Sequence, residues 1–348
     1  METVAKRLSM TDHPVNGPKA RAQVFPFWTS GARAGRVPAP VPIPTPGARP
    51  PPMDETLLSR REALRTTALA GLLLPVAGAL PRALALEAPA ARRPSTLNLG
   101  LATYSLRKYP TEQAVEILKR LQVRSVSVFR VHVPILLSTP DVCRDMAAKF
   151  RDAGLPIAST GVVALANDEG VMRKAFECGR AAGLKTMTAS YKEPPDAATL
   201  RLTERFVAEY DMRIAFHNHG PEDKIFPSPF DVWAAVQPYD KRMGLCLDVG
   251  HATRAGADPV EAIVKCHRRL YDVHIKDTLS RVGDHKDQSV GLGFGRIDLR
   301  AVFAALLDVG YGGQVGLEDE VESDDPIPNI AQSLGYMRGL LAGLTPAA

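Results

Sequence analysis

Short apolar runs alternate with amphipathic segments from residue 97 to residue 319, and this alternation constrains the fold more than any other feature. Each run is too short for a helix and has the length of a strand buried in a parallel sheet. We identify eight such runs, at residues 97–105, 125–131, 156–163, 184–190, 213–219, 244–250, 270–276 and 313–319. Eight strands with a helix after each, within about 250 residues, predict a (β/α)8 TIM barrel of the α/β class.

The segments between the runs carry helical signals, as in TEQAVEILKRLQ and DLRAVFAALLDVGY. Several open with Thr, Ser or Asp at the N-cap position, and glycine closes them at Gly154, Gly183 and Gly310. A doubly wound sheet is the alternative fold. It is disfavoured because no glycine-rich phosphate loop follows the first predicted strand.

Metal-capable side chains stand at the C-terminal ends of the predicted strands, where TIM barrels place their catalytic groups. Asp248 and Glu318 end the sixth and eighth strands, and five histidines end others. These histidines are His132, His217, His219, His251 and His274. A single histidine is more often a core residue, but their convergence at one rim indicates a site. Imidazole and carboxylate ligands suit one divalent ion of Zn, Mn, Fe or Co.

Four motifs in order resemble the xylose isomerase-like TIM barrels, the sugar phosphate isomerase/epimerase superfamily that includes AP endonuclease-like enzymes. They are FHNHG at the fifth strand, LDVGH at the sixth, VHIKD at the seventh and GLEDE at the eighth. The opening GLATYSLR and the run HNHGPED are similar to a Tat-exported branch of that superfamily. The resemblance covers residues 95–343.

This resemblance implies one divalent metal held by Glu, Asp, His and Glu from strands five to eight. Matched residue by residue, the last three ligands are Asp248, His274 and Glu318. The family's strand-five Glu opens an E-N-H triplet, and here the triplet reads His217-Asn218-His219. His217 therefore takes the position of the missing glutamate, and we expect it to be the fourth metal ligand.

The same departure affects the expected catalysis. The resemblance implies that in ketose epimerases two metal-bound glutamates move the proton on opposite faces of the substrate. Glu318 could do this here, but a metal-bound His217 could not, so a further base is needed. The candidates are His219, Glu222, Asp223 and His251. We expect Lys276 either to neutralise the oxyanion of the reaction or to form an ion pair with Asp277 or Glu318.

Three further residues near strand ends are candidates for contact with the substrate: Tyr104, His132 and Asn218. Ordinary packing is the alternative for Tyr104 and His132. Glu320 is expected to point away from the site, because its strand would have to continue that far for it to face inward. The run GLGFGRID (291–298) is expected to form a flexible active-site loop rather than a nucleotide site.

The leading functional hypothesis is a metal-dependent sugar isomerase or epimerase. It would abstract a proton next to a metal-chelated carbonyl and pass through an enediolate. One alternative is a lyase or hydrolase acting on keto-sugars or keto-glycosides, which the missing strand-five glutamate favours. Another is a metal-bearing carbohydrate-binding protein without turnover. A DNA-repair endonuclease is excluded, because its metal cluster needs more ligands and the fourth strand, TMTAS, offers none.

The charge balance excludes a nucleic-acid footprint on the barrel. The formal net charge is +5, but residues 1–85 contain 11 Lys and Arg against 5 Asp and Glu. The remainder has 43 − 11 = 32 basic and 38 − 5 = 33 acidic residues, which is nearly neutral. The four cysteines have no paired spacing and are expected in the core. A small carbohydrate is the expected partner, and whether the chain forms a homo-oligomer is left open.

A proline-rich segment precedes the barrel. Residues 1–52 hold eleven of the 29 prolines, a composition that cannot bury a core and predicts disorder. An export signal after this segment would begin unusually far from the N-terminus. We therefore interpret Met53 as the true start of translation, which a peptide from residues 8–50 in mass spectrometry would refute.

The segment after Met53 resembles a twin-arginine (Tat) export signal. Arg60 and Arg61 precede an apolar run at residues 66–80, and small residues at 83–85 suit a signal peptidase. The run is shorter than the roughly 20 residues of a bilayer span, so no membrane anchor is expected. These signals predict a periplasmic or secreted protein. The predicted organisation is a disordered extension at 1–52, a signal peptide and linker at 53–93, and the barrel at 94–346.

Overall fold

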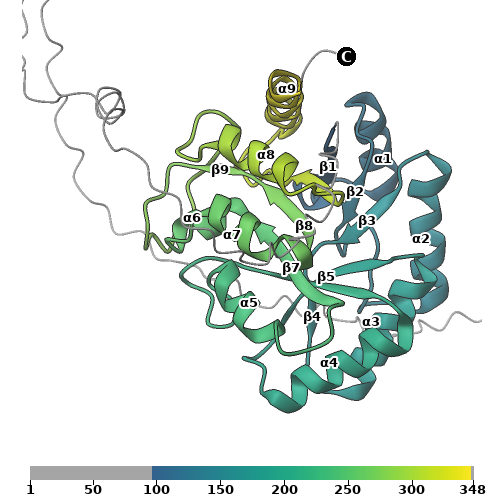
Figure 1. Ribbon diagram of the computed structural model, residues 1–348. Coiled ribbons are helices and arrows are strands. Elements are labelled where there is room, and N and C mark those ends of the chain that lie inside the picture. The colour runs from purple at the N-terminus through teal and green to yellow at the C-terminus, as the bar shows by residue number, and fades with distance from the viewer. Residues whose placement is uncertain (1–95, 346–348) are drawn as a thin grey trace, which may run out of the picture. The chain divides into compact units, whose positions relative to one another are not determined.

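Nine parallel strands form the central sheet of residues 96–345, the part of the chain that the computed structural model describes (Figure 1). Their order is β3-β2-β1-β11-β8-β7-β6-β5-β4, so β1 and β11 pair although they lie at opposite ends of the barrel sequence. The eight predicted runs all overlap these strands, which confirms the TIM barrel. The strands are β1 (Asn98–Ala102), β2 (Val126–Val128), β3 (Ile157–Thr160), β4 (Val163–Leu165), β5 (Thr186–Tyr191), β6 (Arg213–His217), β7 (Met243–Asp248), β8 (Leu270–Ile275) and β11 (Gln314–Leu317).

The third predicted strand is divided into β3 and β4, so the expectation of one continuous strand over 156–163 is wrong. β3 pairs with β2, and β4 pairs with β5. Between them Gly161 passes so close to Phe129 that a Cβ on this glycine would lie 2.9 Å from the ring. The hydroxyl of Thr160 bridges the break, donating to the Thr188 carbonyl (3.0 Å) and accepting from the Thr188 N–H (3.1 Å). A side chain therefore closes the barrel where backbone pairing stops.

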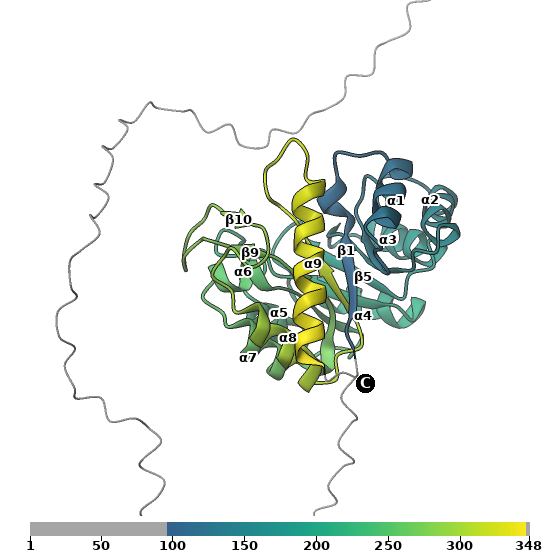
Figure 2. The same ribbon diagram turned by 90° about the horizontal axis from the view of Figure 1, so that it is seen from above.

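Helices follow the strands and form the outer layer (Figure 1). Thr139 and Asp168 accept a backbone N–H from the first turn of their helices, and Gly154 and Gly183 follow helix ends with φ of 72° and 80°. The last helix, α9, packs against α8 and β11 (Figure 2). The helices are η1 (Thr103–Leu106), α1 (Thr111–Arg120), α2 (Pro140–Asp152), α3 (Glu169–Ala181), α4 (Ala197–Tyr210), α5 (Pro229–Val236), α6 (Val249–Arg254), α7 (Pro259–Cys266), η2 (His267–Arg269), α8 (Leu299–Asp308) and α9 (Ile327–Leu344).

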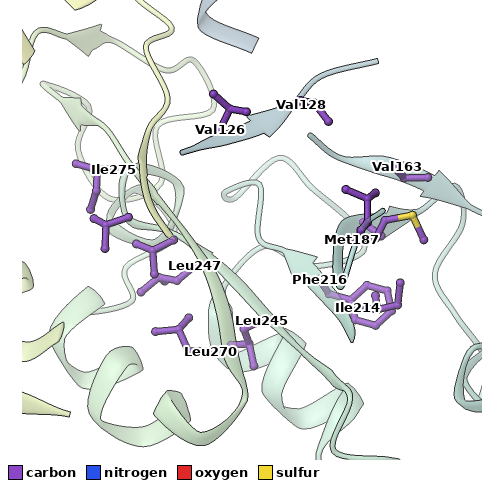
Figure 3. Close-up of a cluster of buried hydrophobic side chains, with 14 of the residues drawn as sticks. Val126, Val128, Val163, Met187, Ile214, Phe216, Leu245, Leu247, Leu270 and Ile275 are labelled. Carbon is purple, nitrogen blue, oxygen red and sulfur yellow. The ribbon is translucent and has the colours of Figure 1, made fainter. Parts of the chain in front are cut away.

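Side chains alternate between the two faces of each strand, and this alternation decides which residues point into the barrel. Phe216 on β6 and Leu247 on β7 belong to the cluster of buried hydrophobic side chains (Figure 3). Successive side chains of a strand point to opposite faces, so His217 and Asp248, which follow them, point the other way, into the barrel. The same alternation separates Ile275 from its neighbour His274 on β8. Strand geometry therefore places polar groups of three neighbouring strands in one interior.

A short antiparallel pair, β9 (Asp277–Thr278) and β10 (Ser289–Val290), extends the chain beyond β8. The carboxylate of Asp277 accepts the backbone N–H groups of Gly293 (3.0 Å), Gly295 (2.9 Å) and Ile297 (3.2 Å). The run GLGFGRID is thus bonded to Asp277 of β9, two residues beyond the end of β8. Its flexibility stays a prediction. The same bonds engage Asp277, so Lys276 does not pair with it.

The four cysteines lie where the sequence places them: three on helices and one on a strand, all buried and free. The predicted extension and export signal, at residues 1–93, lie outside the described residues, and export remains a prediction. Within residues 96–345, no helix is long and apolar enough to cross a membrane.

The bridge across the divided third strand can be tested by replacing Thr160 with valine. This change keeps the shape but leaves the buried N–H and C=O of Thr188 without their side-chain partner. We expect unfolding to become easier by about 1–3 kcal/mol, the usual cost of unsatisfied buried polar groups, measured by urea denaturation. Thr186→Val, on the adjacent β5, is the matched control with a smaller expected effect. Equal losses in both variants would show that the bridge has no special role.

Candidate metal centre and active site

The four residues expected to bind a metal come together at the C-terminal end of the barrel. His217 ends β6, Asp248 ends β7, His274 lies near the end of β8 and Glu318 follows β11. Each offers one ligand atom, and these four atoms all lie within 4.8 Å of one another. All four residues are buried. A second grouping, in which Cys246 joins His217 and His274, is less suitable, because burial raises the pKa of the Cys246 thiol to about 12.

The state of these donors fits a divalent ion. Nε2 of His217 lies 3.1 Å from Nδ1 of His274 and 3.6 Å from Oδ2 of Asp248. Burial and the neighbouring His219 lower the pKa of His217 to about 4, so its ring is neutral and has a free lone pair. Oδ2 of Asp248 is buried and accepts no well-aligned hydrogen bond from the described residues, although the Lys276 ammonium lies 3.1 Å from it. A buried carboxylate oxygen beside a neutral imidazole is a donor set that suits a metal ion.

The backbone of Asp248 is fixed by Asn218. The Asn218 amide accepts the Asp248 N–H and donates to its carbonyl, both at 3.1 Å, and the side chain is fully buried. Asn218 thus has a structural role at Asp248, and its predicted contact with substrate stays a prediction. Oδ1 of Asp248 accepts the His251 N–H (2.8 Å) and caps α6. Only Oδ2 is left for the site.

Asp272 is a residue of the site that the sequence analysis missed. Its Oδ2 accepts hydrogen bonds from Ser159 and Thr188 and lies 3.7 Å from Nε2 of His274. A carboxylate behind a metal-binding histidine orients the ring and leaves the other nitrogen for the metal. Asp272 precedes His274 by two residues on β8, so the period of two could have identified it.

The surroundings of His274 favour positive charge at its ring. Burial alone would lower its pKa, but Cys246 and the carboxylates of Glu318 and Asp272 outweigh burial and hold the pKa well above the usual range. Nδ1 of His274 lies 3.1 Å from Oε2 of Glu318. A divalent ion held here would be stabilised by the same carboxylates.

Lys276 connects the carboxylates of the site. Its Nζ lies 2.7 Å from Oε2 of Glu320, 3.1 Å from Oδ2 of Asp248 and 3.3 Å from Oε2 of Glu318. The expectation that Glu320 points away is wrong, because β11 ends at Leu317 and the chain beyond it no longer follows strand alternation. One ammonium cannot balance three carboxylates, and a bound divalent cation would.

Among the candidate bases, His219 has the most suitable position. β6 ends before it, and its ring centre lies 4.4 Å from that of His217. Nδ1 of His219 lies 3.1 Å from the Asp223 carboxylate, which orients the ring. Its side chain is 35% exposed, so it borders both the metal centre and solvent. A carboxylate-oriented imidazole at the mouth of the site is the geometry of a general base.

Two other base candidates are engaged elsewhere. Glu222 holds Arg254 with both oxygens, at 2.5 and 3.1 Å, so its carboxylate is ion-paired rather than free. His251 lies on α6 rather than on a strand, with Arg254 at 3.0 Å from Nδ1 and Lys276 at 3.3 Å from Nε2. Arg254 was not identified from the sequence. Its position three residues after His251, on the same helix face, is the signal that could have indicated it.

The two remaining candidates for substrate contact differ. His132 is fully buried and bonds Thr103 Oγ1 (2.9 Å) and the Tyr109 carbonyl (3.1 Å), so it packs and the expected substrate contact is wrong. Tyr104, on η1, is half-buried and meets Phe129 edge-on at 4.8 Å. Burial and the carboxylates of Glu320 and Glu318 raise its pKa, which places it beside the site. Tyr104 can therefore form a wall for a ligand.

A metal-affinity series tests this centre. We expect His274→Gln to lose most divalent-metal binding and Asp272→Asn to weaken it by about 10–100-fold, measured by titration calorimetry with Zn²⁺ and Mn²⁺. His267→Gln, at an exposed histidine, is the matched control and should bind as the parent does. Unchanged affinity in His274→Gln would refute the assignment of this ligand set.

The chain matches a family model described as xylose isomerase-like TIM barrel over residues 115–340. It is similar to the rhizopine catabolism protein MocC of Rhizobium meliloti, with 30% identity over 150 residues, 39% of this chain and 44% of that protein. It is also similar to the inosose dehydratase of Clostridium botulinum (strain Eklund 17B / Type B), with 28% identity over 145 residues, 38% of this chain and 47% of that protein. The matches thus span less than half the length of these curated relatives.

Solved structures share the fold. The IolI protein, crystallised with a bound zinc atom, aligns with a TM-score of 0.57 and 16% identity over 72% of this chain and 100% of that chain. The 3-keto-D-glucoside 4-epimerase YcjR of E. coli aligns with a TM-score of 0.54 and 15% identity over 70% of this chain and 99% of that chain. The strand order and the matched family model together show that the chain belongs to the xylose isomerase-like TIM barrel family.

Proposed function

We propose that this protein is a metal-dependent enzyme that removes the proton next to a carbonyl group of a small carbohydrate or cyclitol. The observation that carries the proposal is the buried His217–Asp248–His274–Glu318 cluster, with the oriented His219 at its mouth. A divalent ion held by these four residues would polarise the substrate carbonyl and stabilise the negative charge of an enediolate. The zinc-bearing IolI neighbour supports a metal in this fold without fixing its identity.

The protein side of the chemistry depends on three side chains. Asp223 accepts the Nδ1–H of His219, so Nε2 is the nitrogen that can take a proton from carbon. Lys276 carries an ammonium 2.7 Å from Oε2 of Glu320 and 3.3 Å from Oε2 of Glu318. It can donate a proton or neutralise an oxyanion. The two groups are chemically different, so the site is asymmetric.

This asymmetry favours elimination of water. His219 would accept the proton from the carbon beside the carbonyl, a carbon–carbon double bond would form, and the hydroxyl on the next carbon would leave. Lys276 would protonate the departing hydroxide, so the products are water and an unsaturated ketone or its enol. The inosose dehydratase relatives support this order of preference over the isomerase that the sequence alone ranked first.

Isomerisation or epimerisation is the second candidate. Lys276 and its partner Glu320 could return a proton to the same carbon from the opposite face, which gives the epimer, or to the former carbonyl carbon, which gives the isomer; neither breaks a carbon–oxygen single bond. The YcjR neighbour, an epimerase, supports this reaction at the level of the fold. Both reactions share the first proton transfer and differ only in the second step. Binding of carbohydrate without turnover is the remaining alternative.

The reactions are distinguished by incubating the zinc- or manganese-loaded protein with an inosose and with ketohexoses in deuterated water. Dehydration predicts a product lighter by one water, detected by mass spectrometry. An epimer that carries solvent deuterium would instead establish the second candidate. Sugar binding without exchange or product would leave a binding protein and refute the enzyme.

The base assignment has its own test in the same assay. Replacing His219 with glutamine should lower kcat by roughly 10²–10⁴-fold, because it removes the proton acceptor while leaving the metal ligands intact. The exposed His267→Gln variant is the control and should keep the parent rate. A His219→Gln enzyme with the parent kcat would show that another group is the base.

A further inference from the structure

Arg254 is a fully buried arginine beside the metal centre. Its guanidinium donates to both oxygens of Glu222, to the backbone carbonyl of Asp284 (2.8 Å) and to that of His219 (3.3 Å). Its Nη2 also lies 3.0 Å from Nδ1 of His251, so the two hydrogens of Nη2 are shared among Oε1 of Glu222, the His219 carbonyl and this ring nitrogen. Burying a guanidinium removes it from water, which costs free energy. Its charge therefore affects the protonation of the groups that it contacts.

Both ring nitrogens of His251 face a cationic donor, and the shorter contact, 3.0 Å at Nδ1 against 3.3 Å at Nε2, is the one with Arg254. A guanidinium has N–H donors and no acceptor, so a hydrogen bond at this contact requires Nδ1 of His251 to accept it. In a neutral imidazole the proton is then on Nε2. The ring lies between the cations of Arg254 and Lys276, which opposes a second proton on it. The i, i+3 spacing on α6 fixes this geometry, because both side chains leave the same helix face.

The other nitrogen of His251 faces the site. Nε2 lies 3.3 Å from Nζ of Lys276. An Nε2–H and an ammonium are both donors, so this contact cannot satisfy either of them. Lys276 has the carboxylates of Glu320, Asp248 and Glu318 as acceptors. The Nε2–H of His251 is left to bond an oxygen that enters the site.

We infer that Arg254 is a positioning residue that fixes His251 in the Nε2–H tautomer and so converts it from a candidate base into a hydrogen-bond donor. The tautomer depends on the protein alone. The further role, donation to a substrate oxygen that gains negative charge, rests on the proposed function. A neutral imidazole that donates to a developing oxyanion is an established catalytic device.

The tautomer can be read directly by NMR of protein labelled with ¹⁵N at the histidine rings, recorded without substrate in the metal-free and zinc-loaded forms. His251→Gln identifies the His251 signals. We expect an unprotonated Nδ1 and a protonated Nε2 in the parent protein. A proton on Nδ1, or on both nitrogens, at neutral pH would overturn the inference, and this measurement needs no variant of Arg254.

Variants test the cause. Arg254→Met should release the tautomer, so that the Nδ1–H form becomes populated, and Arg254→Lys, which keeps a donor, should restore the parent spectrum at least in part. Glu222→Gln keeps Arg254 and changes only its carboxylate partner. It is the matched control for a general change in structure at this end of the barrel, and we expect it to keep the Nε2–H form. An Nε2–H form that persists in folded Arg254→Met would contradict the role of Arg254. Because no substrate is used, this result is independent of whether the proposed reaction is found.

Discussion

The C-terminal end of the barrel depends on the interactions of the Asp248 carboxylate. One oxygen caps α6 through the His251 N–H, and the other lies buried between the imidazole of His217 and the ammonium of Lys276. Asn218 clamps the backbone of the same residue from β6. Asp248 thus ends β7, caps α6 and lies among the candidate metal ligands. The geometry of the site is therefore set by the fold.

The barrel could be predicted because it depends on periodicity: short apolar runs and helix caps identify its elements. The four candidate ligands came instead from the family resemblance, matched residue by residue at strand ends, and the structure brings these four side chains together. The partners of side chains beyond the strands could not be predicted, since they depend on how loops from distant parts of the chain meet. For that reason the orientation of Glu320 was predicted wrongly, and the ion pair between Glu222 and Arg254 was not foreseen. The break in the third strand escaped notice because one apolar run covers both halves.

The residues around the cluster divide the chemical work. In the proposed reaction His219, oriented by Asp223, would be the base, and Lys276 with its partner Glu320 would supply the acid. His217, in the position where the family resemblance expects a glutamate, would remove one proton shuttle and leave two chemically different groups for the two proton transfers. A site built this way suits a reaction in which one group takes a proton and another assists a departing hydroxyl.

The proposed chemistry depends most on where a metal binds, and crystals soaked in Zn²⁺ and measured at the zinc absorption edge test this directly. We predict one anomalous peak enclosed by His217, Asp248, His274 and Glu318, with Lys276 shifted toward Glu320. A peak centred on Cys246, or a strong peak elsewhere with none in this cluster, would contradict the central claim.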